Sequence, residues 1–525
     1  MMKKRLAGLL FFCFYVSTLT AQVNLQFRSQ LRFVPTLSNI WGYADTLTGA
    51  EYALVGHEFG LSIVDVSNPD VPQLLFDIPG DTSFWREPKT WSHYAYVTNE
   101  QGGGLLIINL QNLPWSVNTF YWTGGGQLDY KTSHTPFIDE KGILYLNGSK
   151  GINGNAGTLM FDLKPDPFNP QYLGTAAEAY VHDCYVRGDT LWAAEIYTGS
   201  FTVWDVSDKT SPQLLAQQLT PLTFTHNTWL TDNGRYLFTT DERPYASVAC
   251  YDVSDLQNIT LLDEYRSSPL DSLIPHNTYV LPNGYIYTSY YRHGVTIADV
   301  HRPHNIVEIA SYDTSPFPNG PGFEGCWGVY PFLPSGNILC SDRQEGLFVL
   351  TPQLVRACYL EGIVTANGIA QPGVQIELIG TNRYEQSGLT GNYATGAADS
   401  GQYDVRFYYP SACFTKIIPN VLLQPGLVTH LNVDLECDPL TVPSTRDEKS
   451  FRFYFSKGSL WISDLEEIIQ ADVRISDSNG RFVFTQTGDF GNTQIDLKHL
   501  LIPGFYVAEI SGKGMQKRIR FSFSE

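Results

Sequence analysis

Short apolar segments bounded by turn residues recur along most of the chain, and one pattern returns at a nearly constant interval. It is clearest at residues 60–69, where a glycine leads an apolar run that ends in Asp65 before a Ser-Asn-Pro turn. Further copies lie at residues 104–110, 157–163, 201–207, 248–254, 295–300 and, truncated, 346–350. The copies are spaced by roughly 45–50 residues, the period of a four-stranded propeller blade. The aspartate that ends the run is predicted to cap backbone N–H groups of the turn.

The residues around each copy follow the same order from about residue 36 to residue 355. An apolar strand, a turn such as Asp232-Asn233-Gly234, an aromatic strand, the recurrent strand and an outer strand succeed one another. Four short antiparallel strands cannot bury both faces alone, so neighbouring repeats must stack around an axis. We therefore predict an all-β protein in which residues 22–355 form a seven-bladed β-propeller. Because Leu350 is followed by Thr351-Pro352 and not by a full outer strand, the N-terminal segment 22–36 is expected to complete the seventh blade.

The pattern changes after residue 355 and predicts two further small β-domains. Residues 356–437 contain alternating segments typical of a small antiparallel sandwich. Residues 438–450 are rich in Pro, Thr, Ser and charged residues and are predicted to be a linker. Residues 451–525 return to short strands separated by turns such as Asp-Ser-Asn-Gly, so the fold class is a β-propeller followed by two small β-sandwich domains.

The N-terminus and the charge indicate an exported chain. Residues 1–21 combine three basic residues, the apolar run 9–16 and a Leu-Thr-Ala cleavage sequence, which is the pattern of a signal peptide. No later stretch is apolar for long enough to span a bilayer. The net charge of −19 argues against a nucleic-acid partner, because neutralising phosphates requires a basic surface.

Aligning the repeats places one histidine in each of four consecutive blades at the start of the first strand, which lines the channel of a propeller. The residues aligned at this position are Trp41, Trp85, His134, His182, His226, His276 and Trp327. In five repeats an aromatic residue follows three places on: Phe137, Tyr185, Trp229, Tyr279 and Tyr330. Carboxylates recur at the end of the next strand: Glu58, Glu100, Glu195, Asp241 with Glu242, and Asp342. Because the two strands are antiparallel, both sets are expected at one rim of the channel.

Three interpretations of this rim compete. A site for a divalent transition metal, or for acid–base chemistry, would use His134, His182, His226 and His276 with Glu195 and Asp241. In a purely structural role, the histidines would bond to backbone of neighbouring blades or to channel water. A glycan-binding surface would use Trp41, Trp85 and Trp327 to stack on sugars. Catalytic residues are not identified, because the chain has neither a Gly-x-Ser-x-Gly nor a His-Glu-x-x-His motif.

The repeats resemble those of LVIVD-repeat propellers. The runs 226–236, 240–242, 326–331 and 335–342 further resemble the choice-of-anchor B family of surface proteins, over roughly residues 36–355. That resemblance implies a propeller joined to an anchor and supplies no known reaction. Residues 356–437 resemble the carboxypeptidase regulatory-like, transthyretin-like domain, which carries no catalysis. Residues 451–525 resemble the C-terminal sorting domain of the type IX secretion system of Bacteroidetes-type bacteria, which implies passage across the outer membrane and removal of the domain.

Together these patterns predict a binding or scaffold module that passes through the periplasm and is displayed on the outer-membrane cell surface or released. Its partners would be the type IX secretion machinery, through residues 451–525, and an unknown protein or glycan ligand. The alternatives are a metal-dependent hydrolase or oxidoreductase with its site at the channel mouth, and a glycan-binding adhesin. A non-enzymatic role is the favoured expectation.

Overall fold

The computed structural model describes residues 22–149, 157–269, 271–381, 383–409, 415–436, 452–456, 458–463, 469–477, 482–501, 504–512 and 515–523. The predicted signal peptide and the predicted linker lie outside these residues. The described part of the chain contains no α-helix, and accordingly no helix long and apolar enough to cross a membrane. The chain divides into two compact units, one made mainly of residues up to Leu354 and one mainly of residues from Val355 on.

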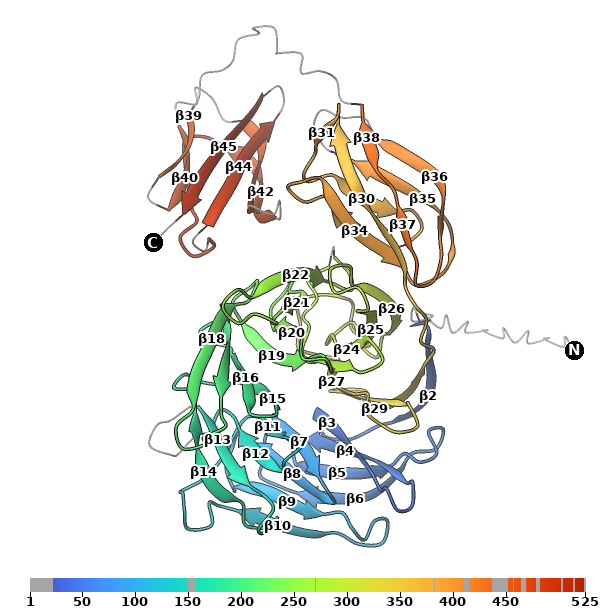
Figure 1. Ribbon diagram of the computed structural model, residues 1–525, viewed down its shortest axis with the longest axis vertical. Coiled ribbons are helices and arrows are strands. Elements are labelled where there is room, and N and C mark those ends of the chain that lie inside the picture. Colours follow the sequence, from blue (N-terminus) through green and yellow to red (C-terminus); the bar gives the residue numbers. More distant parts are fainter. Residues whose placement is uncertain are drawn as a thin grey trace, which may run out of the picture. The chain divides into compact units, whose positions relative to one another are not determined.

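The first unit is a propeller with seven blades, which can be followed from blue to yellow in Figure 1. The first four blades each contain four consecutive antiparallel strands. The first blade contains β3 (Leu37–Ala44), β4 (Glu51–His57), β5 (Gly60–Asp65) and β6 (Gln73–Pro79), and the second contains β7 (Arg86–Trp91), β8 (Tyr94–Asn99), β9 (Leu105–Asn109) and β10 (Asn118–Trp122). The third contains β11 (Pro136–Ile138), β12 (Ile143–Leu146), β13 (Thr158–Asp162) and β14 (Gln171–Ala176). The fourth contains β15 (Asp183–Arg187), β16 (Thr190–Glu195), β17 (Ser200–Asp205) and β18 (Gln213–Leu219).

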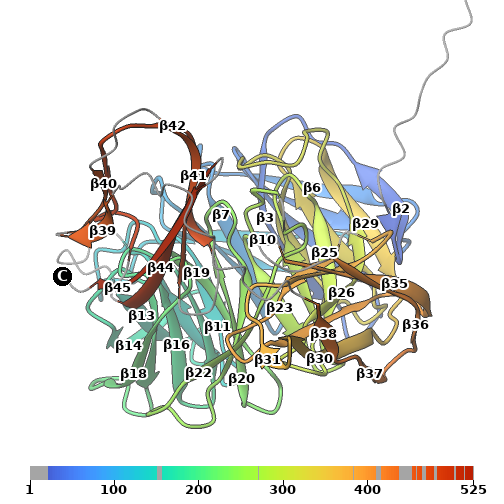
Figure 2. The ribbon, with the colours of Figure 1, turned by 90° about the horizontal axis from the view of Figure 1, so that it is seen from above.

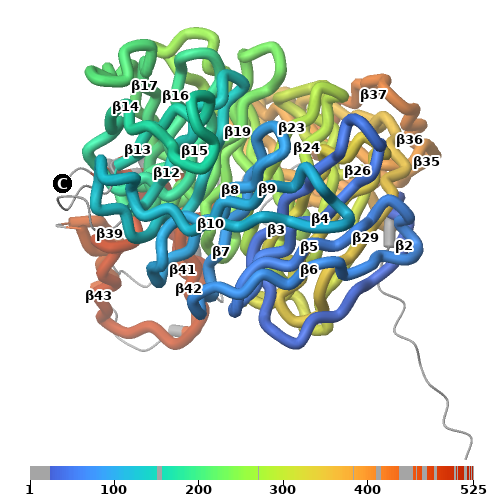
Figure 3. The backbone as a smooth tube through the Cα atoms, turned by 90° about the horizontal axis from the view of Figure 1, so that it is seen from below, coloured from blue at the N-terminus to red at the C-terminus, as the bar shows by residue number. Residues whose placement is uncertain are grey.

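The last three blades complete the ring, and Figure 2 and Figure 3 show the blades from opposite sides. The fifth blade contains β19 (Thr225–Leu230), β20 (Tyr236–Asp241), β21 (Val248–Asp252) and β22 (Thr260–Tyr265). The sixth contains β23 (Thr278–Leu281), β24 (Tyr285–Ser289), β25 (Val295–Asp299) and β26 (Val307–Tyr312), with β1 (Gln22–Val23) added at its edge. The seventh contains β27 (Cys326–Tyr330), β28 (Ile338–Asp342), β29 (Gly346–Pro352) and β2 (Leu25–Leu31). The predicted seven-bladed, all-β architecture is confirmed.

The ring is closed by the N-terminal strand, as predicted. In Figure 1, β2 in blue lies beside β29 in yellow. The pairing is antiparallel and runs from Leu25 opposite Pro352 to Leu31 opposite Leu347. Since β29 would otherwise be an unpaired edge, β2 supplies the outer strand that the seventh repeat lacks.

The recurrent strand is buried because blades pack against both of its faces. In β5 every residue from Gly60 to Val64 is buried, and Asp65 at its end is the first partly exposed one. The Asp65 carboxylate accepts the backbone N–H of Ser67 at 2.9 Å, and Asp205 and Asp252 accept the N–H groups of Ser207 and Ser254 in the same way at 2.8 and 3.0 Å. These aspartates therefore cap turns.

The second unit contains two small two-sheet domains, each with its own apolar core. The first has a sheet of β31 (Ile369–Ala370), β30 (Cys358–Ala366), β34 (Asn392–Ala397), β37 (Val428–His430) and β38 (Val433–Leu435), and a sheet of β33 (Tyr384–Gln386), β32 (Gln375–Leu378), β35 (Gly401–Tyr408) and β36 (Lys416–Leu423). The second has a sheet of β39 (Arg452–Ser456), β40 (Ser459–Ser463) and β43 (Thr493–Asp496), and a sheet of β42 (Phe482–Phe490), β41 (Ile469–Asp477), β44 (Gly504–Gly512) and β45 (Met515–Phe523).

Candidate functional site

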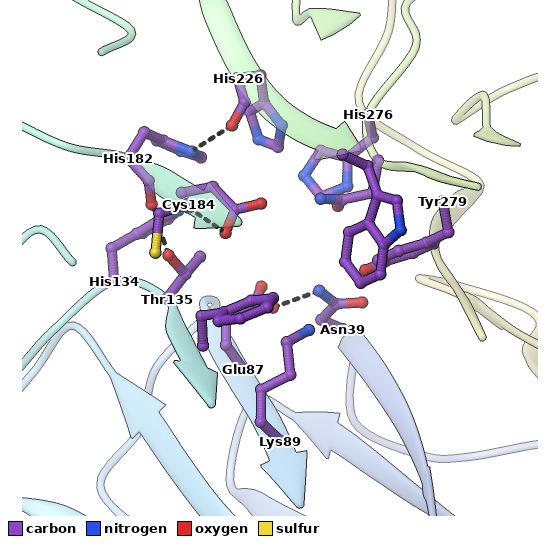
Figure 4. Close-up of a pocket in the computed structure, with 14 residues that line it drawn as sticks. Asn39, Glu87, Lys89, His134, Thr135, His182, Cys184, His226, His276 and Tyr279 are labelled. Carbon is purple, nitrogen blue, oxygen red and sulfur yellow. Dashed lines mark hydrogen bonds between the residues drawn. The ribbon is translucent and has the colours of Figure 1, made fainter. Parts of the chain in front are cut away.

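Four histidines from four consecutive blades form one row at the mouth of the channel. His182 comes directly before the innermost strand of its blade, His134 and His276 stand two residues before theirs, and His226 lies at the start of β19. All four are at most 8% exposed. The ring centroids of successive histidines are 4.1, 4.2 and 4.3 Å apart. The structure thus brings the four predicted histidines together, and Figure 4 shows their side chains around a small cavity.

Backbone carbonyls of the neighbouring blade determine the tautomers of two of these histidines. Nδ1 of His182 lies 3.2 Å from the carbonyl oxygen of His226, and Nδ1 of His276 lies 2.7 Å from that of Trp327. Because a carbonyl only accepts, Nδ1 carries the hydrogen in both rings and Nε2 keeps a free lone pair. Nδ1 of His226 is buried and makes no hydrogen bond of standard geometry, while the backbone carbonyl of His276 interacts with this ring. The row therefore has a structural role between blades and also presents ring nitrogens with free lone pairs.

The four imidazoles differ in their affinity for protons. Burial lowers the pKa of His276 to about 3 and places the pKa of His226 and of His182 well below the ordinary value. His134 differs because its Nδ1 lies 2.5 Å from Oε1 of Glu100. Burial alone would lower the pKa of His134, but this hydrogen bond and the Glu100 charge outweigh it and raise the pKa. At neutral pH the row therefore consists of three neutral imidazoles and one that is paired with a carboxylate.

The carboxylate at the other end of the row is Glu242. Its Oε2 lies 3.8 Å from Nε2 of His226, and its Oε1 lies 3.9 Å from Nε2 of His276. The hydroxyl of Tyr291 donates a hydrogen bond to Oε1. Donor atoms of His226, Glu242 and His276 all lie within 4.8 Å of one another.

The two carboxylates proposed as metal ligands, Glu195 and Asp241, are engaged elsewhere. Glu195 accepts hydrogen bonds from the hydroxyls of Thr202 and Thr198 at 2.6 and 3.1 Å. Asp241 accepts the Thr220 hydroxyl and two backbone N–H groups at 2.6–3.0 Å, which fixes the loop before β19. Successive side chains of a strand point to opposite faces, so Glu242 and not its neighbour Asp241 faces the histidines.

The alignment of the tryptophans is corrected by the strand register. An extra residue at His226 and at Trp327 bulges from the first strand, and the corresponding bulge in β3 includes Ser38. The hydroxyl of Ser38 donates to the carbonyl oxygen of Arg86 at 3.1 Å, the same blade-to-blade bond that His182 makes. Ser38 and Arg86 therefore occupy the histidine position in the first two blades, whereas Trp41 lies three residues further on.

The proposed sugar-stacking set does not form a surface. Trp327 is 4% exposed and lies next to His276, with ring centroids 5.1 Å apart. Trp41 packs inside the channel, where its ring centroid lies 4.8 Å from that of Tyr330. Of the three tryptophans, Trp85 alone is exposed, at 37%. The spacing between the first strand and the glycine of the recurrent strand differs between blades. For this reason the sequence alignment placed Trp41 and Trp85 at the histidine position that Ser38 and Arg86 occupy.

An aromatic layer closes the channel on the far side of the cavity. It consists of the aromatic residues three places beyond the histidine position, Trp41, Phe137, Tyr185, Trp229, Tyr279 and Tyr330, together with Phe332. The Phe332 ring centroid lies 5.4–5.9 Å from those of Trp41, Trp229, Tyr279 and Tyr330. The second blade contributes Lys89 to this layer, and its ammonium lies 3.6 Å from the centroid of the Trp41 ring.

Charged side chains lie between the aromatic layer and the histidine row, and sequence reasoning missed them. Figure 4 shows Asn39, Glu87 and Lys89 across the cavity from His226 and His276. The Asn39 amide donates to the Glu87 carboxylate. The only signal for these residues was the charged run Arg86-Glu87-Pro88-Lys89 at a position where the other repeats are less charged. The cavity has a volume of about 10 Å³, enough for one water molecule or ion.

Replacing Glu87 by Gln is expected to change how stability depends on pH. Burial raises the pKa of Glu87 from 4.5 to about 7, so the folded protein holds this proton more tightly than the unfolded chain. The stabilisation of the folded protein by this bound proton is complete below about pH 4.5 and is lost as the pH rises through about 7. The free energy of unfolding of wild type relative to Glu87→Gln should therefore fall by roughly 3 kcal/mol between about pH 4.5 and about pH 8. Urea unfolding at several pH values measures this difference. For Glu178→Gln, at an exposed position, the difference in free energy of unfolding from wild type should not change with pH. A difference that is likewise constant with pH for Glu87→Gln would contradict the prediction.

Comparison with known proteins identifies one of the repeats. The LVIVD repeat family model matches residues 49–78, which include β4, β5 and all but the last residue of β6. No curated protein matches the chain. Among solved structures, the β-propeller domain of Cps50 (Swd1) from Myceliophteria thermophila is similar, with 11% identity and a TM-score of 0.44, over 62% of this chain and 99% of that one. The chain therefore carries a stretch that matches the LVIVD repeat, within a unit whose own strands form a seven-bladed β-propeller.

Proposed function

We propose that the protein is an exported binding or scaffold module whose ligand surface is the histidine-bearing end of the propeller. The observation that carries this proposal is a set of exposed aromatic side chains on the loops at that end. They are 37–76% exposed and are Phe59, Phe84, Trp85, Tyr197, Tyr245, Phe317 and Phe323. Each lies in a loop that follows the second strand of a blade or precedes the first strand of a blade. In an antiparallel blade both kinds of loop lie at the end where the histidines begin.

The opposite end of the propeller is different. Of the described residues in its loops, the exposed large apolar side chains are Leu47, Val71, Trp115 and, in the segment after β29, Leu354, of which one is aromatic. Single exposed apolar residues are ordinary on protein surfaces, but a concentration at one end marks an interaction surface. Aromatic rings supply large contact areas with few rotatable bonds, which suits binding to a protein or to the faces of sugar rings. A glycan-binding adhesin remains a specific form of this proposal, with Trp85 as the one predicted tryptophan on the surface.

A metal-dependent hydrolase or oxidoreductase is the second candidate, favoured by the grouping of His226, Glu242 and His276. The cavity of about 10 Å³ inside the channel has no room for an organic substrate. A substrate would therefore have to approach from the aromatic end. This requirement places binding at the same surface in both candidates.

Delivery to the cell surface belongs to the same proposal. The signal-peptide pattern of residues 1–21 supports entry into the periplasm, and the resemblance of residues 451–525 to sorting domains supports recognition by the type IX secretion machinery. Residues 356–437 would then act as a spacer of the carboxypeptidase regulatory-like type. The product would be attached to the outer-membrane surface or released.

Binding of the chain from residue 22 onward to an array of glycans and of surface proteins tests the ligand surface. The double variant Trp85→Ser, Tyr245→Ser should weaken binding at least tenfold, because both rings lie at the proposed surface and are 37% and 56% exposed. Trp115→Ser at the opposite end is the matched control and should leave binding unchanged. Equal loss in both variants, or no ligand at all, would contradict the proposal.

In a bacterium with type IX secretion, protease should reach the full chain from outside, and a chain ending at Leu440 should stay protected in the periplasm.

A further inference from the structure

We propose that His226, Glu242 and His276 bind a divalent transition-metal ion at the channel mouth. This inference is independent of the proposed ligand surface, because it rests on side chains inside the mouth. Donor atoms of all three residues lie within 4.8 Å of one another. The residues come from adjacent blades: His226 lies at the start of β19 and Glu242 follows β20, both in the fifth blade, and His276 precedes β23 of the sixth.

The present distances are close to those of a metal site. Protein nitrogen and oxygen ligands lie roughly 2.0–2.2 Å from such an ion, so two of them lie roughly 3–3.5 Å apart. The Nε2 atoms of His226 and His276 lie 3.8 and 3.9 Å from the nearer Glu242 oxygens. The two histidine–carboxylate pairs have to close by less than about 1 Å, and the widest pair among the three donors, at up to 4.8 Å, by roughly 1.5 Å.

The hydrogen bonds around Glu242 and His276 leave two acceptors facing each other. Nδ1 of His276 donates to the Trp327 carbonyl oxygen at 2.7 Å, so Nε2 has a lone pair and no hydrogen. That lone pair faces Oε1 of Glu242 at 3.9 Å, too far for a direct hydrogen bond. Two acceptors directed at one point are stabilised by a cation between them. His134 and Arg343 both act electrostatically on Glu242 and His276. The Arg343 guanidinium lies over the Trp327 ring, 4.8 Å from the ring centroid.

The partners of these ligands resemble the outer shell of a metal site. Ligating histidines commonly donate their other ring nitrogen to a carbonyl, as His276 does, and ligating carboxylates accept a further hydrogen bond, as Glu242 does from Tyr291. Nδ1 of His226 is buried and makes no hydrogen bond of standard geometry, although the backbone carbonyl of His276 interacts with the ring.

The donor set indicates the class of ion. Two imidazoles and one carboxylate suit zinc, iron(II), cobalt(II) or manganese(II), whereas magnesium and calcium prefer oxygen ligands alone. Three protein donors leave at least one coordination position for water or for an atom of a ligand. Glu100 and His134 form a separate pair at the other end of the row, with a direct bond of 2.5 Å, and are not part of the site.

Metal titration of the chelator-treated chain from residue 22 onward tests the site. Zinc binding by calorimetry and cobalt(II) binding by its visible absorption should both give one ion per chain. The variant His226→Asn, His276→Asn should weaken zinc binding at least 100-fold, and the conservative Glu242→Gln at least tenfold and with a changed cobalt spectrum. Thermal unfolding of each variant shows whether the propeller is still folded.

Two matched controls decide whether the assignment is correct. Glu195→Gln removes a rim carboxylate that bonds to Thr202 and Thr198, and it should leave affinity and spectrum unchanged. Glu100→Gln should also leave both unchanged. Absence of stoichiometric binding in wild type would overturn the proposal, as would equal affinity in wild type and Glu242→Gln. Loss of binding in Glu100→Gln but not in Glu242→Gln would move the site to the other end of the row and overturn this assignment.

Discussion

Removal of residues 22–31 is expected to lower the midpoint of thermal unfolding by roughly 10 °C or more. The deletion removes β2, which pairs with β29 from Leu25 to Leu31 and buries Leu25 to 1% exposure. Lost backbone hydrogen bonds and lost apolar burial together are on the order of 5 kcal/mol. The deletion also leaves β29 as an open edge, which favours pairing between molecules and aggregation. Calorimetry of chains that begin at residue 22 and at residue 32 measures the effect.

A shorter deletion is the control for that experiment. Removing only residues 22–23 takes away β1, which pairs with β26 through two residues at the edge of the sixth blade. The ring stays closed, so the midpoint should fall by much less. Equal midpoints for the chains starting at residues 22 and 32 would show that β2 does not hold the ring together.

Replacing Tyr279 by Ala is expected to destabilise the propeller by roughly 3–5 kcal/mol. Tyr279 is 2% exposed, and its ring centroid lies 4.8 Å from that of Trp229 and 5.8 Å from that of Phe332. Truncation would leave a cavity where rings from several blades meet, and the rigid strands around it cannot collapse to fill the space. Urea unfolding followed by tryptophan fluorescence measures the loss.

Tyr279→Phe is the matched control because it keeps the ring and removes only the hydroxyl. It should cost about 1 kcal/mol or less. A loss below about 1 kcal/mol for Tyr279→Ala would mean that the aromatic layer fills the channel without holding the blades together. A similar large loss in both variants would instead assign the stability to the hydroxyl and not to ring packing.

The two ends of the cavity have different physical characters. On one side the aromatic layer and Lys89 close the channel through ring packing and a cation–π contact. On the other side the histidine row keeps lone pairs and a carboxylate near the mouth, beneath loops with exposed aromatic rings. A ligand held by those rings would come close to an ion held by His226, Glu242 and His276, so the two proposals describe neighbouring surfaces that separate experiments examine.

The sequence by itself determined the architecture of the propeller. Strand length, the alternation of apolar residues and turn chemistry are local properties, and a fixed period of local units specifies how many blades stack. The incomplete seventh repeat after Leu350 and the unassigned strand at the N-terminus together predicted the closure by β2. The four histidines were found for the same reason, because they repeat at one position of the local unit.

Only the tertiary structure decided which side chains face the histidines. A bulge at Ser38 shifts the register of the first blade, so Trp41 belongs to the aromatic layer and not to the rim. Glu242, and not the predicted Asp241, lies beside His226, because neighbouring residues at a strand end point in opposite directions. Lys89 lies over the Trp41 ring and Glu87 accepts a hydrogen bond from Asn39, both of the first blade, a proximity that no local pattern encodes. Loop lengths, bulges and contacts between distant blades are set by packing of the whole ring, and for that reason the site could be located from the sequence but not assembled from it.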